Sequence, residues 1–224
     1  MPAPKPTRDE LARMIDHAVL KPQATPSDLE AACELVRSRR VGCLCVRPCD
    51  VAEAAERLRG GDTLVGTVIS FPHGVSSTAA KAAESRQAVA DGAAELDMVL
   101  NIGRLIAGDL DYVRDDIRTV VDASEGRTVK VIFECCYLSP ERIRAACRAS
   151  LEARAGFVKT STGFGEYGAR VEDVRLMREC VGPNVGVKAS GGIRTLDDVL
   201  AMIEAGADRL GTSSTAALLD ALPE

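Results

Sequence analysis

Short apolar segments rich in β-branched residues alternate along the chain with longer segments of helical periodicity. Several of the apolar segments are almost continuously hydrophobic, which is typical of strands buried on both faces of a parallel sheet. The pattern predicts eight strands, which cover residues 17–20, 42–46, 64–70, 95–100, 129–134, 156–160, 186–189 and 209–211.

The segments between these strands carry helix start and stop signals. Thr25 and Ser139 each precede a proline, so each is placed to cap a helix whose first residue is that proline. Thr195 provides a third cap, and Gly206 is placed to end the same helix. Two further helices are predicted over residues 77–91 and 110–123.

Strands that alternate with helices predict a parallel sheet, and eight such units in 224 residues favour an α/β fold of the closed (β/α)8 TIM-barrel type. An open doubly wound sheet usually carries a glycine-rich fingerprint after its first strand, whereas residues 21–23 here read Lys-Pro-Gln. No segment has the length or composition of a linker. We therefore predict one domain over residues 1–224, with residues 1–7 as a disordered tail.

The composition excludes several classes of function. A net charge of −5 gives neither a basic nucleic-acid surface nor a polybasic membrane segment. Without a signal peptide or an 18-residue apolar run, we expect a cytoplasmic protein and no membrane partner. The eight cysteines form no CxxC pair, and His17 and His73 are far apart, so we expect core thiols and no metal site.

Three lysines lie inside otherwise apolar strands. Lys130, Lys159 and Lys188 follow one another at intervals of 29 residues, about one strand–helix unit, so we expect similar heights on adjacent strands. Lysine is rarely buried unless it is paired, and a single strand lysine is more often structural than catalytic. Three in register, with Asp97 on a neighbouring strand, indicate an active site at the carboxyl ends of the strands.

This arrangement suits imine chemistry. A lysine must be unprotonated to attack a carbonyl, and both burial and a neighbouring ammonium lower its pKa. An imine turns the substrate carbon into an electron sink without a metal or cofactor, and Asp97 is placed to move protons. The residues alone do not rank the three lysines.

Glycines and serines follow the last strands. The loops after strands seven and eight of such barrels, with a helix N-terminus, often bind phosphate. Gly191 and Gly192 follow the seventh strand, Ser213 and Ser214 follow the eighth, and Gly163 follows the strand of Lys159. We therefore expect a phosphorylated substrate.

Nearly end to end, the chain resembles the deoxyribose-phosphate aldolases, class I aldolases of the (β/α)8 fold. Six segments carry the resemblance: IDHAVLKP from residue 15, CVRP from 45, GTVISFPHG from 66, ELDMVLNIG from 95, FVKTSTGF from 157 and GVKASGGIRT from 186. The resemblance implies reversible cleavage of 2-deoxy-D-ribose 5-phosphate into D-glyceraldehyde 3-phosphate and acetaldehyde, and a homodimer or larger homo-oligomer.

The resemblance also implies roles for single residues. Lys159 would form the imine, and Lys188 and Asp97 would share proton transfer. Asp16 and Lys130 would line the same pocket and contact the substrate. The positions implied to contact phosphate are Gly163, Gly191, Gly192, Ser213 and Ser214.

Four positions depart from residues common in the family: Ala18, Arg47, Ser70 and Cys135. Of these, we expect Ala18 and Cys135 near the pocket rim. Some members also have a longer C-terminal tail whose last tyrosine reaches the active site, whereas this sequence stops at Glu224.

Three alternative functions stay open at this point. The chain could be a class I aldolase for another phosphorylated sugar, or a non-catalytic barrel that binds a sugar phosphate. An isomerase on the same fold would need a carboxylate base at a strand end, and Glu134 is the candidate.

Overall fold

A computed structural model describes residues 5–222 and contains all eight predicted strands, each within two residues of its predicted bounds. The first four residues of the predicted disordered tail, and two of the C-terminal residues of the predicted domain, lie outside the described range. The strands are β1 (Ile15–Val19), β2 (Cys43–Val46), β3 (Leu64–Ile69), β4 (Glu95–Val99), β5 (Thr128–Ile132), β6 (Phe157–Lys159), β7 (Gly186–Ser190) and β8 (Arg209–Thr212).

The helices confirm the predicted caps. Thr25 and Thr195 each form a capping box, Ser139 caps the helix that starts at Pro140, and Gly206 takes a positive φ of 106° just after its helix ends. The α-helices are α1 (Arg8–Met14), α2 (Pro26–Ser38), α3 (Val51–Arg57), α4 (Thr78–Ala90), α5 (Ile102–Ala107), α6 (Leu110–Ala123), α7 (Pro140–Glu152), α8 (Val171–Val181), α9 (Leu196–Glu204) and α10 (Thr215–Asp220), with 3-10 turns η1 (Pro48–Asp50) and η2 (Cys135–Tyr137).

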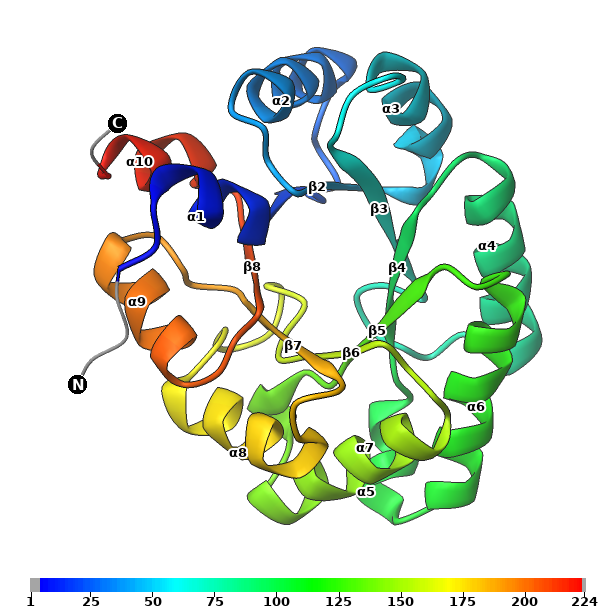
Figure 1. Ribbon diagram of the computed structural model, residues 1–224. Coiled ribbons are helices and arrows are strands. Elements are labelled where there is room, and N and C mark those ends of the chain that lie inside the picture. Colours follow the sequence, from blue (N-terminus) through cyan, green and yellow to red (C-terminus); the bar gives the residue numbers. More distant parts are fainter. Residues whose placement is uncertain (1–4, 223–224) are drawn as a thin grey trace.

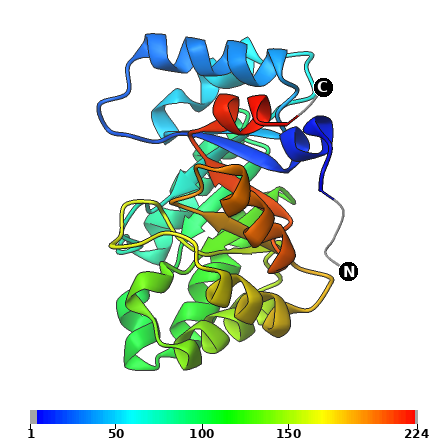
Figure 2. The ribbon, with the colours of Figure 1, turned by 90° about the vertical axis from the view of Figure 1, so that its left-hand side faces the viewer.

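Every strand pairs in parallel with the next, and β8 pairs with β1, so the sheet closes into a barrel surrounded by helices (Figure 1). The predicted TIM barrel is confirmed. Helix α1 and the loop that follows β6 lie at opposite ends of the barrel (Figure 2). Within residues 5–222, no helix combines the length and the apolar character needed to cross a membrane.

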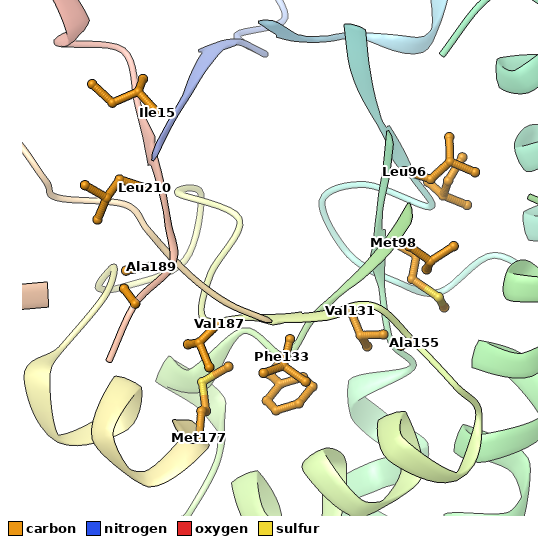
Figure 3. Close-up of a cluster of buried hydrophobic side chains, with 14 of the residues drawn as sticks. Ile15, Leu96, Met98, Val131, Phe133, Ala155, Met177, Val187, Ala189 and Leu210 are labelled. Carbon is orange, nitrogen blue, oxygen red and sulfur yellow. The ribbon is translucent and has the colours of Figure 1, made fainter. Parts of the chain in front are cut away.

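The hydrophobic core lies between the strands and the helices. Residues such as Leu96, Met98, Val131 and Leu210 point away from the barrel axis toward the surrounding helices (Figure 3). Because side chains alternate across a strand, the residues between them point into the barrel. The polar side chains of these strands therefore point into the barrel, while their apolar side chains face the helices.

One buried ion pair stabilises the helical layer. Lys81 on α4 and Asp116 on α6 have fully buried side chains, and Lys81 Nζ lies 2.5 Å from Asp116 Oδ2. The same ammonium donates to the carbonyl of Val99 at the end of β4, 2.9 Å away. The outer layer is thus held to β4 by a charged pair that is separate from the barrel interior.

Candidate active site

The inward positions of the strands bring the three predicted lysines together. Lys130, Lys159 and Lys188 alternate with outward-facing valines on β5, β6 and β7, and each is at most 3 % exposed. Asp97 on β4 and Asp16 on β1 are fully buried. Burial of so many charges requires that they neutralise one another.

The strand register refines the expected heights of the lysines. Lys159 pairs directly with Lys188, as predicted. Lys130 instead pairs with Phe157, two residues before Lys159. The expected similar heights thus hold for Lys159 and Lys188, whereas Lys130 lies one inward position nearer the amino ends of the strands. The equal spacing in sequence hid this shift because loop and helix lengths differ between units.

Asp97 is the centre of the cluster. Its Oδ2 atom accepts hydrogen bonds from Lys159 Nζ and Lys188 Nζ, each at 2.7 Å, and its Oδ1 atom accepts one from Lys130 Nζ at 2.9 Å. The predicted proximity of Asp97 to the lysines is confirmed. One carboxylate thus touches both the implied nucleophile and its neighbouring ammonium.

Glu95 and Arg209 complete the cluster, and neither was predicted as a site residue. Lys130 Nζ lies 2.6 Å from Glu95 Oε2 and 3.1 Å from Asp16 Oδ2. Arg209 Nε donates to Asp16 Oδ1 at 2.8 Å, and Arg209 Nη1 donates to Glu95 Oε1 at 3.3 Å. The sequence prediction considered the carboxyl ends of the strands, whereas Glu95 and Arg209 are each the first residue of a strand. The signal that could have identified them is their alternation with outward-facing residues, which points their side chains into the barrel.

The geometry ranks the lysines, which sequence reasoning from the residues could not do. Lys130 contacts three carboxylates and Lys188 contacts two, those of Asp16 and Asp97. Lys159 contacts only that of Asp97 among the ion pairs of residues 5–222. Lys159 is therefore the least neutralised ammonium of the three.

The pKa shifts follow the same order. Burial lowers the pKa of Lys159 below its usual range, and the nearby Lys188 ammonium adds to this while Asp97 opposes it. Burial alone would lower the pKa of Lys188 too, but Asp16 and Asp97 outweigh it and raise that pKa. The pKa of Lys130 is raised well above its usual range for the same reason. Lys159 is thus the lysine whose neutral amine is favoured.

Asp16, Cys43 and Glu95 have ligand atoms within 4.8 Å of one another, which is close enough for a metal ion. The Lys130 ammonium donates to two of these residues, and Arg209 donates to the same two carboxylates. Burial raises the pKa of the Cys43 thiol well above its usual range, so it is a poor thiolate ligand. The donor set fits protein cations better than a metal.

A cavity of about 580 Å³ opens above the cluster. Lys159, Lys188 and Asp16 reach its wall, together with all five residues predicted to contact phosphate: Gly163, Gly191, Gly192, Ser213 and Ser214. Lys130 and Asp97 are not on the wall. Lys130 lies beneath the cavity, so the expected substrate contact of Lys130 is not supported by its position.

The glycine loops give this cavity its polar end. Gly163, Gly191 and Gly192 have φ values of 86°, 84° and 81°, a region that favours glycine. Gly168 packs against the Gly191 backbone so closely that a Cβ on Gly168 would lie 2.1 Å from the Gly191 carbonyl oxygen. The side-chain oxygen of Ser190, also on the wall, is buried without a hydrogen-bond partner. A buried hydroxyl without a partner beside these glycine loops suits an anionic ligand group.

Two expectations for the rim have opposite outcomes. Ala18 lines the cavity as expected, whereas Cys135 is fully buried and does not. Cys135 is the first residue of η2, and its carbonyl accepts a hydrogen bond from Tyr167 Oη at 3.2 Å. The prediction for Cys135 is therefore wrong, because the chain enters η2 directly after β5 and Cys135 packs in the hydrophobic core.

Glu134 is also withdrawn from the cavity. It is 2 % exposed, and its carboxylate accepts hydrogen bonds from the backbone N–H and the hydroxyl of Thr162. A carboxylate committed to holding the β6 loop is a poor catalytic base. The isomerase alternative thus lacks its base.

Taken together, a closed (β/α)8 barrel, a buried lysine with a lowered pKa and an anion-compatible cavity are features of an aldolase. The comparisons with known proteins agree with this class. The chain matches the profile of the DeoC/LacD family aldolases over residues 11–221, and it belongs to that family.

Similar proteins cover nearly the whole chain. Deoxyribose-phosphate aldolase 1 of Bacillus licheniformis is 50 % identical over 214 residues, which are 95 % of this chain and 96 % of that protein. A crystal structure of a candidate deoxyribose-phosphate aldolase from Coccidioides immitis superposes with a TM-score of 0.94 at 39 % identity, covering 97 % and 87 % of the two chains. The tetrameric deoxyribose phosphate aldolase of Aeropyrum pernix superposes with a TM-score of 0.88 at 30 % identity, covering 96 % of this chain and 92 % of that chain.

Proposed function

We propose that this enzyme is a class I aldolase that reversibly cleaves 2-deoxy-D-ribose 5-phosphate into D-glyceraldehyde 3-phosphate and acetaldehyde. The observation that carries the proposal is the position of Lys159: it reaches the cavity wall, it contacts one carboxylate, and its pKa is lowered. Curated relatives at about 50 % identity are deoxyribose-phosphate aldolases, which supports the same substrate.

The chemistry follows from these contacts. The neutral Lys159 amine adds to C1 of the open-chain sugar, and the carbinolamine loses water to form an iminium ion. A base takes the proton of the C3 hydroxyl, the C2–C3 bond breaks, and its electrons move into the iminium to give an enamine. Lys188 Nζ lies 2.7 Å from Asp97 Oδ2, and these two groups carry this proton, with Asp97, which is not on the cavity wall, acting through Lys188 or water. Protonation at C2 and hydrolysis then release acetaldehyde and free Lys159.

A coupled assay tests the proposed reaction. Glyceraldehyde 3-phosphate formed from deoxyribose 5-phosphate is measured with a dehydrogenase, and the reverse reaction is run with acetaldehyde or dihydroxyacetone phosphate as donor. We expect cleavage, and synthesis with acetaldehyde only. Synthesis with dihydroxyacetone phosphate would favour an aldolase for another phosphorylated sugar, and no turnover in either direction would favour a binding protein.

The serines at the polar end of the cavity provide a test of the phosphate site. Replacing both Ser213 and Ser214 by alanine removes two hydroxyl donors from the cavity wall. Since each hydrogen bond to a charged group contributes about 1.5–3 kcal/mol, we expect the loss of two to lower kcat/KM for deoxyribose 5-phosphate by about 10²- to 10⁴-fold. Unphosphorylated deoxyribose is the control substrate. An equal loss for both sugars would contradict phosphate binding by these serines.

The second lysine provides a test of the pKa mechanism. In Lys188→Met, Asp97 loses one of its two Oδ2 partners and Lys159 loses a neighbouring positive charge, so the pKa of Lys159 rises. Each unit of rise lowers the neutral fraction at pH 7 about tenfold. We expect slow imine formation at pH 7 that recovers in part toward pH 9. A loss independent of pH would argue against this role of Lys188.

We further propose a homo-oligomer in the cytoplasm. The tetrameric Aeropyrum pernix relative supports the assembly. All eight cysteines are free, which suits a reducing compartment.

A further inference from the structure

Arg209 lies at the amino end of β8, on the side of the charged cluster away from the cavity. It pairs in register with Lys188, and its guanidinium contacts a carboxylate on the adjacent strand β1 and, across the barrel, a carboxylate on β4. Nε and Nη2 both donate to Asp16 Oδ1, while Nη1 and Nη2 donate to the two oxygens of Glu95. Arg209 is not on the cavity wall, so it acts on the chemistry only through other residues.

The cluster carries one more cation than anion. Titratable groups face the interior from seven strands: Asp16 on β1, Cys43 and Cys45 on β2, Glu95 and Asp97 on β4, Lys130 on β5, Lys159 on β6, Lys188 on β7 and Arg209 on β8. Burial raises the pKa of both thiols, so they stay neutral. Three carboxylates therefore face four potential cations.

We propose that Arg209 is a positioning residue for imine formation, because its fixed charge on Asp16 and Glu95 makes Lys159 the surplus cation of the network. This inference rests on the proposed function. An excess charge in a buried site is costly, and the network becomes neutral when one lysine loses its proton. Lys159 has the fewest carboxylate partners, so it is the lysine that does so.

Arginine suits this position for two physical reasons. Its guanidinium stays protonated at any pH at which proteins are folded, so it never takes over the role of the neutral amine. Its planar fork donates to two carboxylates at once, which fixes Asp16 so that Oδ2 is left for Lys130 and Lys188. The contacts also raise the pKa of Arg209 against the effect of burial, which acts the other way.

The test is the pH dependence of imine formation. Acetaldehyde is trapped on the full-length enzyme with borohydride across pH 5–10, and the adduct on Lys159 is quantified by mass spectrometry. In Arg209→Met the three carboxylates face three lysines, so Lys159 keeps its proton. We expect the midpoint of adduct formation against pH to move to higher pH by about one unit or more. Each unit of this shift should reduce the trapped adduct at pH 7 about tenfold.

Charge compensation separates this role from a merely structural one. Glu95→Gln alone increases the positive surplus, so its midpoint should move to lower pH. The double variant Arg209→Met with Glu95→Gln restores a surplus of one, so its midpoint should return toward that of the unaltered enzyme. A structural role would instead make the double variant the most impaired. If Arg209→Met does not fold, two other variants test the same charge balance. The midpoint should move to lower pH in Glu95→Gln and stay unshifted in Arg209→Lys.

Arg178 provides the matched control. Its guanidinium contacts Asp208 and the carbonyls of Gly206, Gly182 and Val185, outside the charged network. The Arg178→Met variant should be less stable than the unaltered enzyme, and its midpoint of adduct formation against pH should be unchanged. Unshifted midpoints in folded Arg209→Met and in Glu95→Gln would overturn the inference while leaving the aldolase proposal intact. Absence of a Lys159 adduct in the unaltered enzyme would instead overturn the proposed function.

Discussion

Lys159→Met is expected to abolish aldolase activity while leaving the barrel at least as stable as before. The substitution removes the amine proposed to form the iminium ion, so the coupled assay should show a loss of about four orders of magnitude or more in kcat. It also removes the surplus cation, and three carboxylates then face Lys130, Lys188 and Arg209. Thermal unfolding should therefore show an unchanged or raised Tm.

Borohydride trapping with deoxyribose 5-phosphate checks the same residue independently. The unaltered enzyme should carry the sugar fragment on Lys159, and Lys159→Met should carry none. Lys21, an exposed lysine on the cavity wall, is the matched control, since Lys21→Met should still be labelled on Lys159. An adduct found on Lys188 or Lys130 would refute the assignment of the nucleophile.

Asp97→Asn is expected to impair both activity and stability. The amide leaves three buried ammonium groups without the carboxylate that they share, and breaking such buried pairs costs about 3–5 kcal/mol of unfolding free energy. For a chain of this size the Tm should fall by about 10 °C. Loss of the proton-transfer group should reduce kcat by about 10²- to 10⁴-fold.

The stability loss in Asp97→Asn should depend on pH. Burial alone would raise the pKa of Asp97, but Lys130, Lys159 and Lys188 hold it well below its usual range. A lowered folded-state pKa stabilises the protein above the unfolded pKa of about 3.9, and this contribution disappears as pH falls through the folded value. The Tm difference from the unaltered enzyme should be full at pH 7 and shrink below about pH 4.

Asp116→Asn is the matched control for Asp97→Asn. Asp116 is an equally buried carboxylate with a lysine partner, but it lies between α4 and α6. Its removal should lower the Tm and leave kcat per folded molecule unchanged. A similar loss of kcat in Asp116→Asn would mean that the effect at Asp97 comes from general loosening of the fold.

The architecture and most of the site could be predicted from the amino-acid sequence. Hydrophobic periodicity predicted all eight strands, and the caps at Thr25, Ser139 and Thr195 predicted their helices, because these signals depend on neighbours within a few residues. The 29-residue interval between the lysines, with Asp97 on a neighbouring strand, also predicted that these four residues form one site. These features are local in the chain, so one sequence suffices to identify them.

The ranking of the three lysines depends on contacts that form only in the folded barrel. That ranking depends on Asp16 and Arg209, 193 residues apart, and on Glu95, whose contact with Arg209 crosses the barrel from β4 to β8. The register between strands, which moves Lys130 beneath the cavity, follows from how the barrel closes and not from spacing along the chain. Charges interact through distances in space, not along the chain. The sequence could therefore distinguish Lys159 from the other two lysines only by resemblance, whereas in the folded protein Lys159 differs because it has the fewest carboxylate partners.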